Sequence, residues 1–329
     1  MAIFYAVEQG LIIQKEGERL IAKKDNKIIK FLHFHNLEQL ILIGRIGLTP
    51  AVIFELLKRN IDTVFLSYSG RYLGRLSSIG GKNIELRFRQ YESLKDELFK
   101  LNLAKKIVRG KIENQRLFLR RINRKGLGLE DTILKLRVFS EKVKEGSSLD
   151  EIRGIEGTTS RVYFDAYAKG LLGAGIGFDK RERRPPKDPA NALLSLGYTL
   201  LFSHVFSIVN MVGLDPYIGF FHAINYGKPS LALDLMEEWR PIIVDAVVMN
   251  AFNLKVIKRE DFVVEEEGVC LTRDGWRKFI AQFERKMSEK VKHPHQGIRL
   301  TYRGCIEAQA RQLVRHIKGE EEYTPAVFR

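Results

Sequence analysis

Acidic side chains are concentrated on one stretch of sequence that is otherwise apolar. The segment after Ser230, LALDLMEEWRPIIVDAVVMNAF, is apolar around most of a helical circumference, which predicts a buried helix. At 100° per residue, its four carboxylates fall within one arc of about 100°. They are Asp234, Glu237, Glu238 and Asp245. Buried carboxylates need a cation or hydrogen-bond donors, so a bound cation is one interpretation of the arc. The alternative is that Arg240 and other arginines pair with these acids, or that the arc faces solvent.

Two other side chains could complete such a site. His222 lies on a turn just before the acidic helix, although a histidine beside Phe220 and Phe221 is also typical of a core. Glu156 lies on an earlier predicted helix, between glycines that would let a ligand or another backbone approach closely. Carboxylates with one imidazole suit Mg²⁺ or Mn²⁺. Such a site near basic helices implies metal-assisted phosphodiester chemistry.

The charge of the chain indicates a polyanionic partner. Its 329 residues include 55 Lys and Arg against 40 Asp and Glu, a net charge of +15. Residues 82–125 hold 14 Lys and Arg against 5 Asp and Glu, an excess of nine. A solvated helix face would normally carry both signs, so this one-signed excess favours contact with nucleic acid.

The elements that position these residues divide the chain in two. Residues 11–44 and 61–77 consist of short apolar or alternating runs separated by turn residues, which predicts strands. Thr49 and Pro50 predict the start of one helix between them. We therefore predict an α+β fold: a small, mainly antiparallel β domain with one inserted helix at residues 1–78, a linker at 79–85, and a larger all-α catalytic domain at 86–329.

Several features indicate a soluble cytoplasmic protein without a membrane partner. The first residues, MAIFYAVEQG, do not have the pattern of a secretion signal. The long apolar run 196–213 contains His204 and Asn210, which favours a buried core helix over a membrane span. The two cysteines, Cys270 and Cys305, do not form a Cys-x-x-Cys motif, which argues against a disulfide scaffold and a structural zinc site.

Four ordered blocks carry a family resemblance that covers essentially the whole chain. These blocks resemble the CRISPR-associated integrase of spacer acquisition, the catalytic member of the adaptation pair. They are GIEGTTSRVYFDAY (154–167), RRPPKDPANALLSLGYTLL (183–201), LDPYIGFFH (214–222) and SLALDLMEEWRPIIVD (230–245).

The resemblance implies a metal site and an activity. Glu156, His222 and Glu237 match the family's metal ligands and catalytic residues, and Asp234 matches a supporting acid. The implied cofactor is Mg²⁺ or Mn²⁺. The implied reaction is attack by the 3′-hydroxyl of a short DNA fragment on a repeat of the CRISPR array, together with nuclease activity on branched and other DNA. The implied assembly is a homodimer, formed largely through the β-rich domain, with a small companion protein.

Basic side chains near this site are candidates for DNA contact. One group flanks a Pro-Pro pair, and capping or salt bridging is its alternative role. A second group shares one face of the last predicted helix, where it forms either an ion-pair ladder with Glu307 or a stripe facing DNA. The two groups are Arg181, Arg183, Arg184 and Lys187, and Arg303, Arg311 and Arg315.

Two other functions are compatible with parts of this pattern. A general DNA repair or junction nuclease, acting without a companion protein, would use the same metal site. A non-catalytic nucleic-acid scaffold would explain the charge, but the acid-rich buried helix argues against it.

Overall fold

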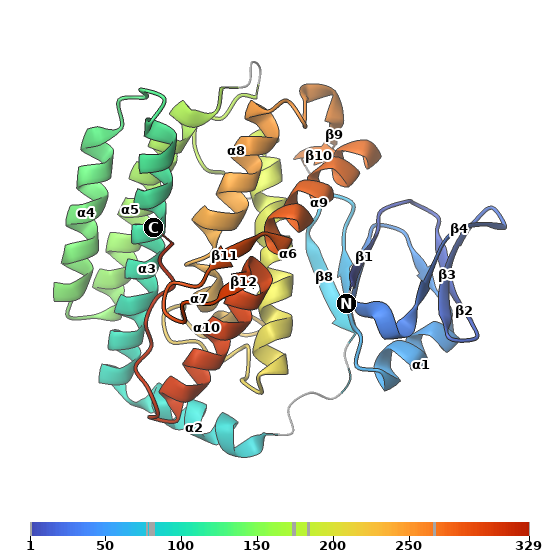
Figure 1. The fold of residues 1–329 in the computed structure, drawn as a ribbon, viewed down its shortest axis with the longest axis horizontal. Coiled ribbons are helices and arrows are strands. Elements are labelled where there is room, and N and C mark those ends of the chain that lie inside the picture. The colour runs from blue at the N-terminus through green and yellow to red at the C-terminus, as the bar shows by residue number, and fades with distance from the viewer. Residues whose placement is uncertain are drawn as a thin grey trace. The chain divides into compact units, whose positions relative to one another are not determined.

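The computed structural model describes residues 2–76, 78, 83–172, 176–182, 185–265 and 268–328. The chain forms two compact units, which are described separately below (Figure 1). The first unit comprises Met1–Gly80 and Glu260–Arg277, and the second comprises Gly81–Arg259 and Lys278–Arg329. The boundary near residue 277 lies inside helix α9 (Arg273–Ser288).

The first unit contains two four-stranded sheets. The order of one sheet is β1 (Ala2–Ala6), β5 (Leu37–Ile43), β7 (Asp62–Leu66) and β8 (Tyr72–Leu76). The order of the other is β4 (Lys27–His33), β3 (Arg19–Lys24), β2 (Ile12–Glu16) and β6 (Gly47–Leu48). The N-terminal part of this unit also contains the short turn η1 (Phe34–Asn36) and helix α1 (Pro50–Lys58).

Both sheets are mixed, whereas the sequence predicted mainly antiparallel pairing. The β1–β5, β5–β7 and β2–β6 pairs are parallel. Parallel neighbours require a crossover connection, and α1 lies in the connection between β5 and β7. The tight turn from β3 to β4 is as predicted, because Asp25 and Asn26 both adopt positive φ values, 47° and 62°.

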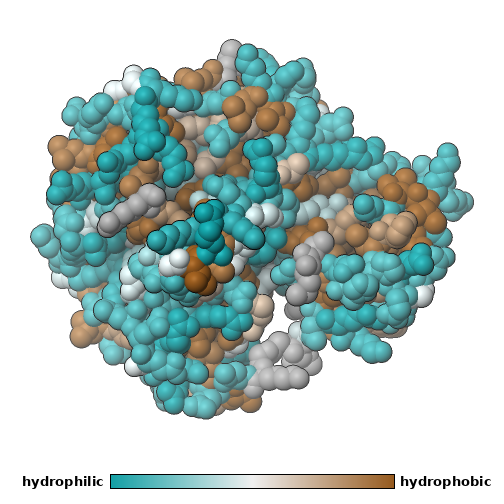
Figure 2. All heavy atoms as spheres, in the orientation of Figure 1, coloured by the Kyte–Doolittle hydropathy of each residue, from teal (hydrophilic) through white to brown (hydrophobic). Residues whose placement is uncertain are grey.

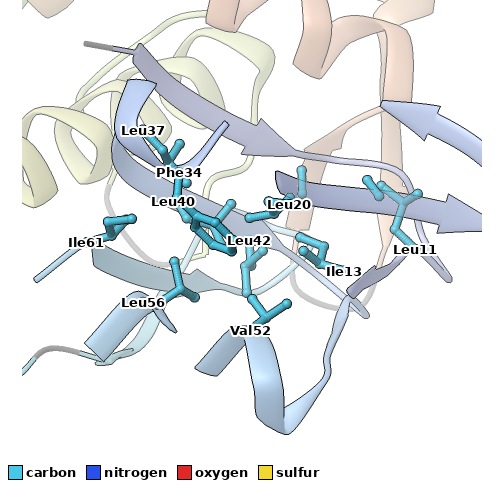
Figure 3. Close-up of a cluster of buried hydrophobic side chains, with 12 residues drawn as sticks. Leu11, Ile13, Leu20, Phe34, Leu37, Leu40, Leu42, Val52, Leu56 and Ile61 are labelled. Carbon is cyan, nitrogen blue, oxygen red and sulfur yellow. The ribbon is translucent and has the colours of Figure 1, made fainter. Parts of the chain in front are cut away.

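The core of the first unit is formed by apolar side chains from β2, β3, β5 and α1. Figure 3 shows Leu20, Leu40 and Leu42 close to Val52 and Leu56 of α1. These five side chains are almost completely buried. The predicted strands and the predicted helix therefore stabilise one another through a shared apolar cluster.

A hairpin from late in the chain belongs to the first unit, although the sequence-based division placed it in the helical domain. It follows the short turn η3 (Arg259–Asp261) and consists of β9 (Phe262–Glu265) paired with β10 (Gly268–Leu271). An ion pair between Arg273 and Glu8 links this region to the N-terminal sheets. Such a pairing across 265 residues has no local signal in the sequence.

The second unit is mostly helical, and the α+β class with a β-rich start and a helical remainder is confirmed. Asn83 caps its first helix, because its side chain accepts a hydrogen bond from Leu86 N, and that helix starts two residues before the predicted boundary. A short strand pair, β11 (Lys290–Lys292) with β12 (Arg299–Thr301), interrupts an otherwise helical region. Its other elements are α2 (Ile84–Lys95), α3 (Glu97–Asn123), α4 (Glu130–Glu145), α5 (Leu149–Gly170), α6 (Pro189–Met211), α7 (Ser230–Met236), η2 (Arg240–Asp245), α8 (Ala246–Asn253) and α10 (Tyr302–Ile317).

Three of these helices, α3, α4 and α5, pack side by side, and α3 also contacts η2 (Figure 1). Helix α6 packs against α7, η2 and α8. By length and composition α6 could cross a membrane, but 72% of its most apolar 18-residue stretch is buried inside the protein. It is therefore the buried core helix that the apolar run predicted.

The acidic segment is not one continuous α-helix, which corrects the sequence-based interpretation. It consists of α7, the π-helix η2 and α8. Pro241 lies at the start of η2 and has no backbone N–H, so the regular α-helical hydrogen bonding cannot continue through it. The count of 100° per residue therefore fails beyond Trp239, so it does not place Asp245, the one acid of the four that follows Pro241.

Candidate metal centre

Two of the predicted acids meet at a buried lysine. Glu156 on α5 and Glu237, directly after α7, both form ion pairs with Lys111 on α3. The Lys111 ammonium donates a hydrogen bond to Glu156 Oε1. It lies 2.7 Å from Glu237 Oε2, but that buried oxygen receives no aligned hydrogen bond. Two carboxylates from different helices thus share one positive charge.

His222 is held beside this pair by Asp234. The His222 ring Nδ1 and its backbone N–H lie 2.7 and 2.9 Å from Asp234 Oδ1, and the N–H groups of Phe220 and Phe221 donate to Oδ2. A carboxylate oxygen accepts hydrogen bonds, so this contact favours the tautomer with the proton on Nδ1. The other nitrogen, Nε2, lies 3.8 Å from Glu237 Oε1. Orientation of a histidine by a carboxylate in this way is typical of metal ligands.

Glycine makes this arrangement possible at Gly219. A Cβ there would lie 2.8 Å from Asp234 Oδ2 and 2.6 Å from Ser230 Cβ, closer than a side chain can be. The turn before His222 can therefore close over the buried Asp234 carboxylate only because residue 219 has no side chain. With both oxygens occupied by these donors, Asp234 acts on the site through His222.

Positive neighbours keep the central acids ionised. Burial alone would raise the pKa of Glu237, but Arg240 and Lys111 outweigh it and hold that pKa at about 2. Burial would likewise raise the pKa of Glu156, but Lys111 outweighs burial, and that pKa is lowered. Burial would lower the pKa of Lys111, yet Glu237 and Glu156 raise it above its usual value. The cluster is therefore ionic at neutral pH.

Arg240 forms the outer side of the cluster. Its Nη2 lies 3.0 Å from Glu237 Oε1, and its guanidinium lies over the ring of Tyr198 at 4.8 Å. Pairing between Arg240 and an acid of this segment was the structural alternative raised by the sequence, and it is present for Glu237.

The other two acids of the segment face elsewhere. Asp245 accepts hydrogen bonds from the hydroxyls of Tyr163 and Tyr198, and burial raises its pKa to about 6. Glu238 accepts from the Tyr323 hydroxyl and the Ala326 N–H, and burial raises its pKa to about 8. Both acids have neutral donors as partners and stabilise the packing of neighbouring segments.

The donors are of chemical types that suit a divalent cation. Two carboxylates and one imidazole nitrogen converge, and a cationic group already lies between the carboxylates. Among the residues that the structure describes, no three acidic, histidine or cysteine side chains could hold an ion as they stand. At this centre the position between the two glutamates is taken by Lys111.

The predicted DNA-contact residues are in varied surroundings. Arg181 donates to Asn191 Oδ1 and Ser195 Oγ and lies over the Tyr198 ring, so it contributes to the fold. Lys187 is exposed, 3.5 Å from a Glu182 oxygen. Arg183 and Arg184 lie outside the described residues.

The three arginines of the last helix, α10, are each paired with an acid. Arg311 pairs with Glu307 one turn earlier, as an ion-pair ladder predicts. The other two pair with acids outside the helix: Arg303 with Glu284, and Arg315 with Glu321. Their contact with DNA stays a prediction.

Sequence reasoning missed Lys111. It was counted within the basic excess of 82–125, although it lies on the buried face of α3, four residues after Ile107 and one turn before Gln115. A lysine in register with the apolar positions of a helix was the signal that could have identified it.

Comparison with known proteins identifies the family of the chain. Residues 4–285 match the family described as CRISPR associated protein Cas1. The chain is 36% identical to CRISPR-associated endonuclease Cas1 3 of Thermus thermophilus, with 100% of this chain and 98% of that protein aligned.

Two solved structures have the same fold. A casposase bound to an integration product superposes with a TM-score of 0.90 at 25% identity, covering 100% of this chain and 95% of that one. A chain of a Cas6-RT-Cas1–Cas2 complex superposes with a TM-score of 0.86 at 29% identity, covering 99% of this chain and 36% of that one. The matched family spans both compact units, and the chain therefore belongs to the Cas1 family of CRISPR-associated proteins.

Proposed function

We propose that this protein is a metal-dependent DNA endonuclease and integrase that inserts short DNA fragments into a CRISPR array. Family membership supports the class of enzyme, because the aligned Thermus thermophilus relative is named an endonuclease and the similar casposase is bound to an integration product. The observation that carries the proposal is that Glu156 and Glu237 share one cation position, with His222 beside it.

The site residues have separate roles in this proposal. Glu156, Glu237 and His222 Nε2 would hold Mg²⁺ or Mn²⁺. Bound there, the ion would polarise the scissile phosphate and stabilise charge on the attacking and leaving oxygens. Asp234 orients the His222 ring through Nδ1, and Arg240 fixes one oxygen of Glu237. The nucleophile is the 3′-hydroxyl of the incoming fragment.

The proposed partners are double-stranded and branched DNA, a second copy of the chain and a small companion protein. The net charge of +15 supports a DNA substrate. The structure titled Cas6-RT-Cas1–Cas2 complex supports a companion, since the matching chain there is assembled with Cas2. We place the protein in the cytoplasm, where a CRISPR array would be accessible.

The first unit supports the proposed homodimer. Strand β4 is at the edge of its sheet, and three large apolar side chains on it, Ile28, Ile29 and Phe31, are between 49% and 57% exposed. Figure 2 shows hydrophobic surface in the region of β3 and β4. An exposed apolar edge of this kind is typical of a contact surface.

The test is a DNA-joining assay. Short fragments with 3′-hydroxyl ends are incubated with a supercoiled plasmid that carries a repeat, the companion protein and Mn²⁺. We expect the unaltered protein to join them, and Glu156→Ala and His222→Ala to abolish joining while DNA binding persists. Glu113→Gln is a matched control, because this glutamate on α3 forms its ion pair with Arg116 and not with a residue of the cluster.

Two outcomes would change the conclusion. Cleavage without joining, with the repeat and companion present, would favour the repair or junction nuclease. Unchanged joining by Glu156→Ala or His222→Ala would remove the proposed site.

A further inference from the structure

Lys111 is built into the centre and does not reach it from solvent. Its side chain is 6% exposed, and its ammonium contacts both Glu156 and Glu237. The preceding residue, Gly110, lets α3 approach closely, because a Cβ there would lie 2.6 Å from Pro325 Cβ and 3.0 Å from Glu238 Cγ. The backbone of α3 therefore holds the lysine beside the segment that carries Glu237.

The two glutamates of the centre already have cationic partners. The carboxylates of Glu156 and Glu237 are matched by the cations Lys111 and Arg240. Arg240 contacts Oε1 of Glu237, which leaves Oε2 between the lysine and any other cation. Two positive charges within a few ångströms repel strongly in a buried site, so an ammonium and a divalent ion would compete for these oxygens.

We propose that Lys111 and the divalent metal are alternative occupants of the Glu156–Glu237 pair, so that this lysine sets how tightly the protein binds metal. This inference rests on the proposed function. Without metal, the ammonium supplies the counter-charge that the buried Glu237 and the partly buried Glu156 need. Metal binding must first separate Lys111 from both glutamates. The free energy needed for that separation reduces the observed affinity for metal.

The test measures metal affinity and does not depend on activity. The full-length protein is titrated with Mn²⁺, and free Mn²⁺ is followed by its electron paramagnetic resonance signal. Lys111→Met removes the competing charge and keeps most of the volume. We expect it to bind Mn²⁺ at least about tenfold more tightly than the unaltered protein, because the competitor is gone. We also expect a lower melting temperature without metal and a larger rise when Mn²⁺ is added.

Controls separate this inference from the proposed function. Lys106→Met, on the same helix but paired with Glu322 at the surface, should leave Mn²⁺ affinity unchanged. Glu156→Gln should abolish binding at the site, and if it does not, the proposed function fails together with the inference. If Glu156→Gln abolishes binding but Lys111→Met binds Mn²⁺ with equal or weaker affinity, only the inference is overturned. Should Lys111→Met fail to fold, Lys111→Gln is titrated in its place with the same expectation.

Discussion

Two sites in the helical unit surround their acidic side chains with different partners: cations at one site and neutral hydroxyls at the other. Glu156 and Glu237 face Lys111 and Arg240, and the pKa of Glu237 is held at about 2. Asp245 faces the hydroxyls of Tyr163 and Tyr198, and its pKa is raised to about 6. We call the first group the cation-lined cluster and the second the hydroxyl-lined cluster.

This difference in the charge of the partners indicates which acids could exchange a bound cation for another. In the cation-lined cluster the carboxylates stay charged, so another cation can replace the one present. In the hydroxyl-lined cluster the donors are neutral and fixed by packing, so the acid stabilises the fold. Both clusters hold carboxylates inside the helical unit, and the charge of the neighbours distinguishes a candidate metal centre from a structural hydrogen-bond network.

The largest expected effect is a loss of DNA joining when an acid of the cation-lined cluster is replaced, compared with an acid of the hydroxyl-lined cluster. Glu237→Gln should reduce DNA joining by more than about 100-fold, because loss of a ligand exceeds the 10–100-fold effect of changes outside the first coordination shell. Asp245→Asn should reduce joining far less, since that acid does not face the candidate centre. Equal losses in the joining assay would mean that the distinction between the clusters is wrong.

A smaller effect is expected where Asp234 supports the cation-lined cluster. Asp234→Asn keeps the shape but weakens the hold on the His222 Nδ1–H and on three backbone N–H groups. Mn²⁺ affinity should fall about 10–100-fold, as for other residues that orient a metal ligand. Titration with Mn²⁺ checks this, and an unchanged affinity would show that His222 does not depend on Asp234.

The hydroxyl-lined cluster should appear in the pH dependence of stability. The pKa of Asp245 rises from an ordinary 3.8 to about 6 on folding, so between about pH 4 and 6 the folded state binds more protons than the unfolded chain. The contribution of Asp245 to the free energy of unfolding is fully present below about pH 4 and is lost by about pH 6. This contribution is at most about 3 kcal/mol. Melting curves should show this decline in the unaltered protein relative to Asp245→Asn. Parallel curves would contradict it.

The smallest effect concerns one hydroxyl. Tyr198→Phe removes the donor to Asp245 Oδ1 and keeps the ring beneath Arg240. The free energy of unfolding should fall by about 1–2 kcal/mol, because a buried acceptor loses its partner. Denaturant unfolding measures this change, and Mn²⁺ affinity should stay the same. A clear loss of affinity would link the two clusters.

Local signals in the sequence predicted the elements, while contacts between distant segments were not predictable. The Asp25–Asn26 turn and the helix start at Thr49–Pro50 were identified because each depends on neighbouring residues alone. The attachment of β9 and β10 to the first unit depends on contacts with residues more than 180 positions earlier in the chain.

The candidate site also contains residues that the sequence predicted and residues that it did not. The family resemblance selected Glu156, His222 and Glu237, and the structure brings their side chains together. Their role as metal ligands stays a prediction. Lys111 was missed because only the fold reveals that this side of α3 faces two glutamates. The π-helix at Pro241 was missed because regular helical counting was assumed through a proline.

The most direct test of the metal centre is anomalous diffraction from crystals grown with Mn²⁺. We predict one manganese peak coordinated by Glu156, Glu237 and His222 Nε2, with the Lys111 ammonium moved off both carboxylates. A map in which Lys111 still lies between the two glutamates, with manganese absent there at saturating concentration, would contradict the account.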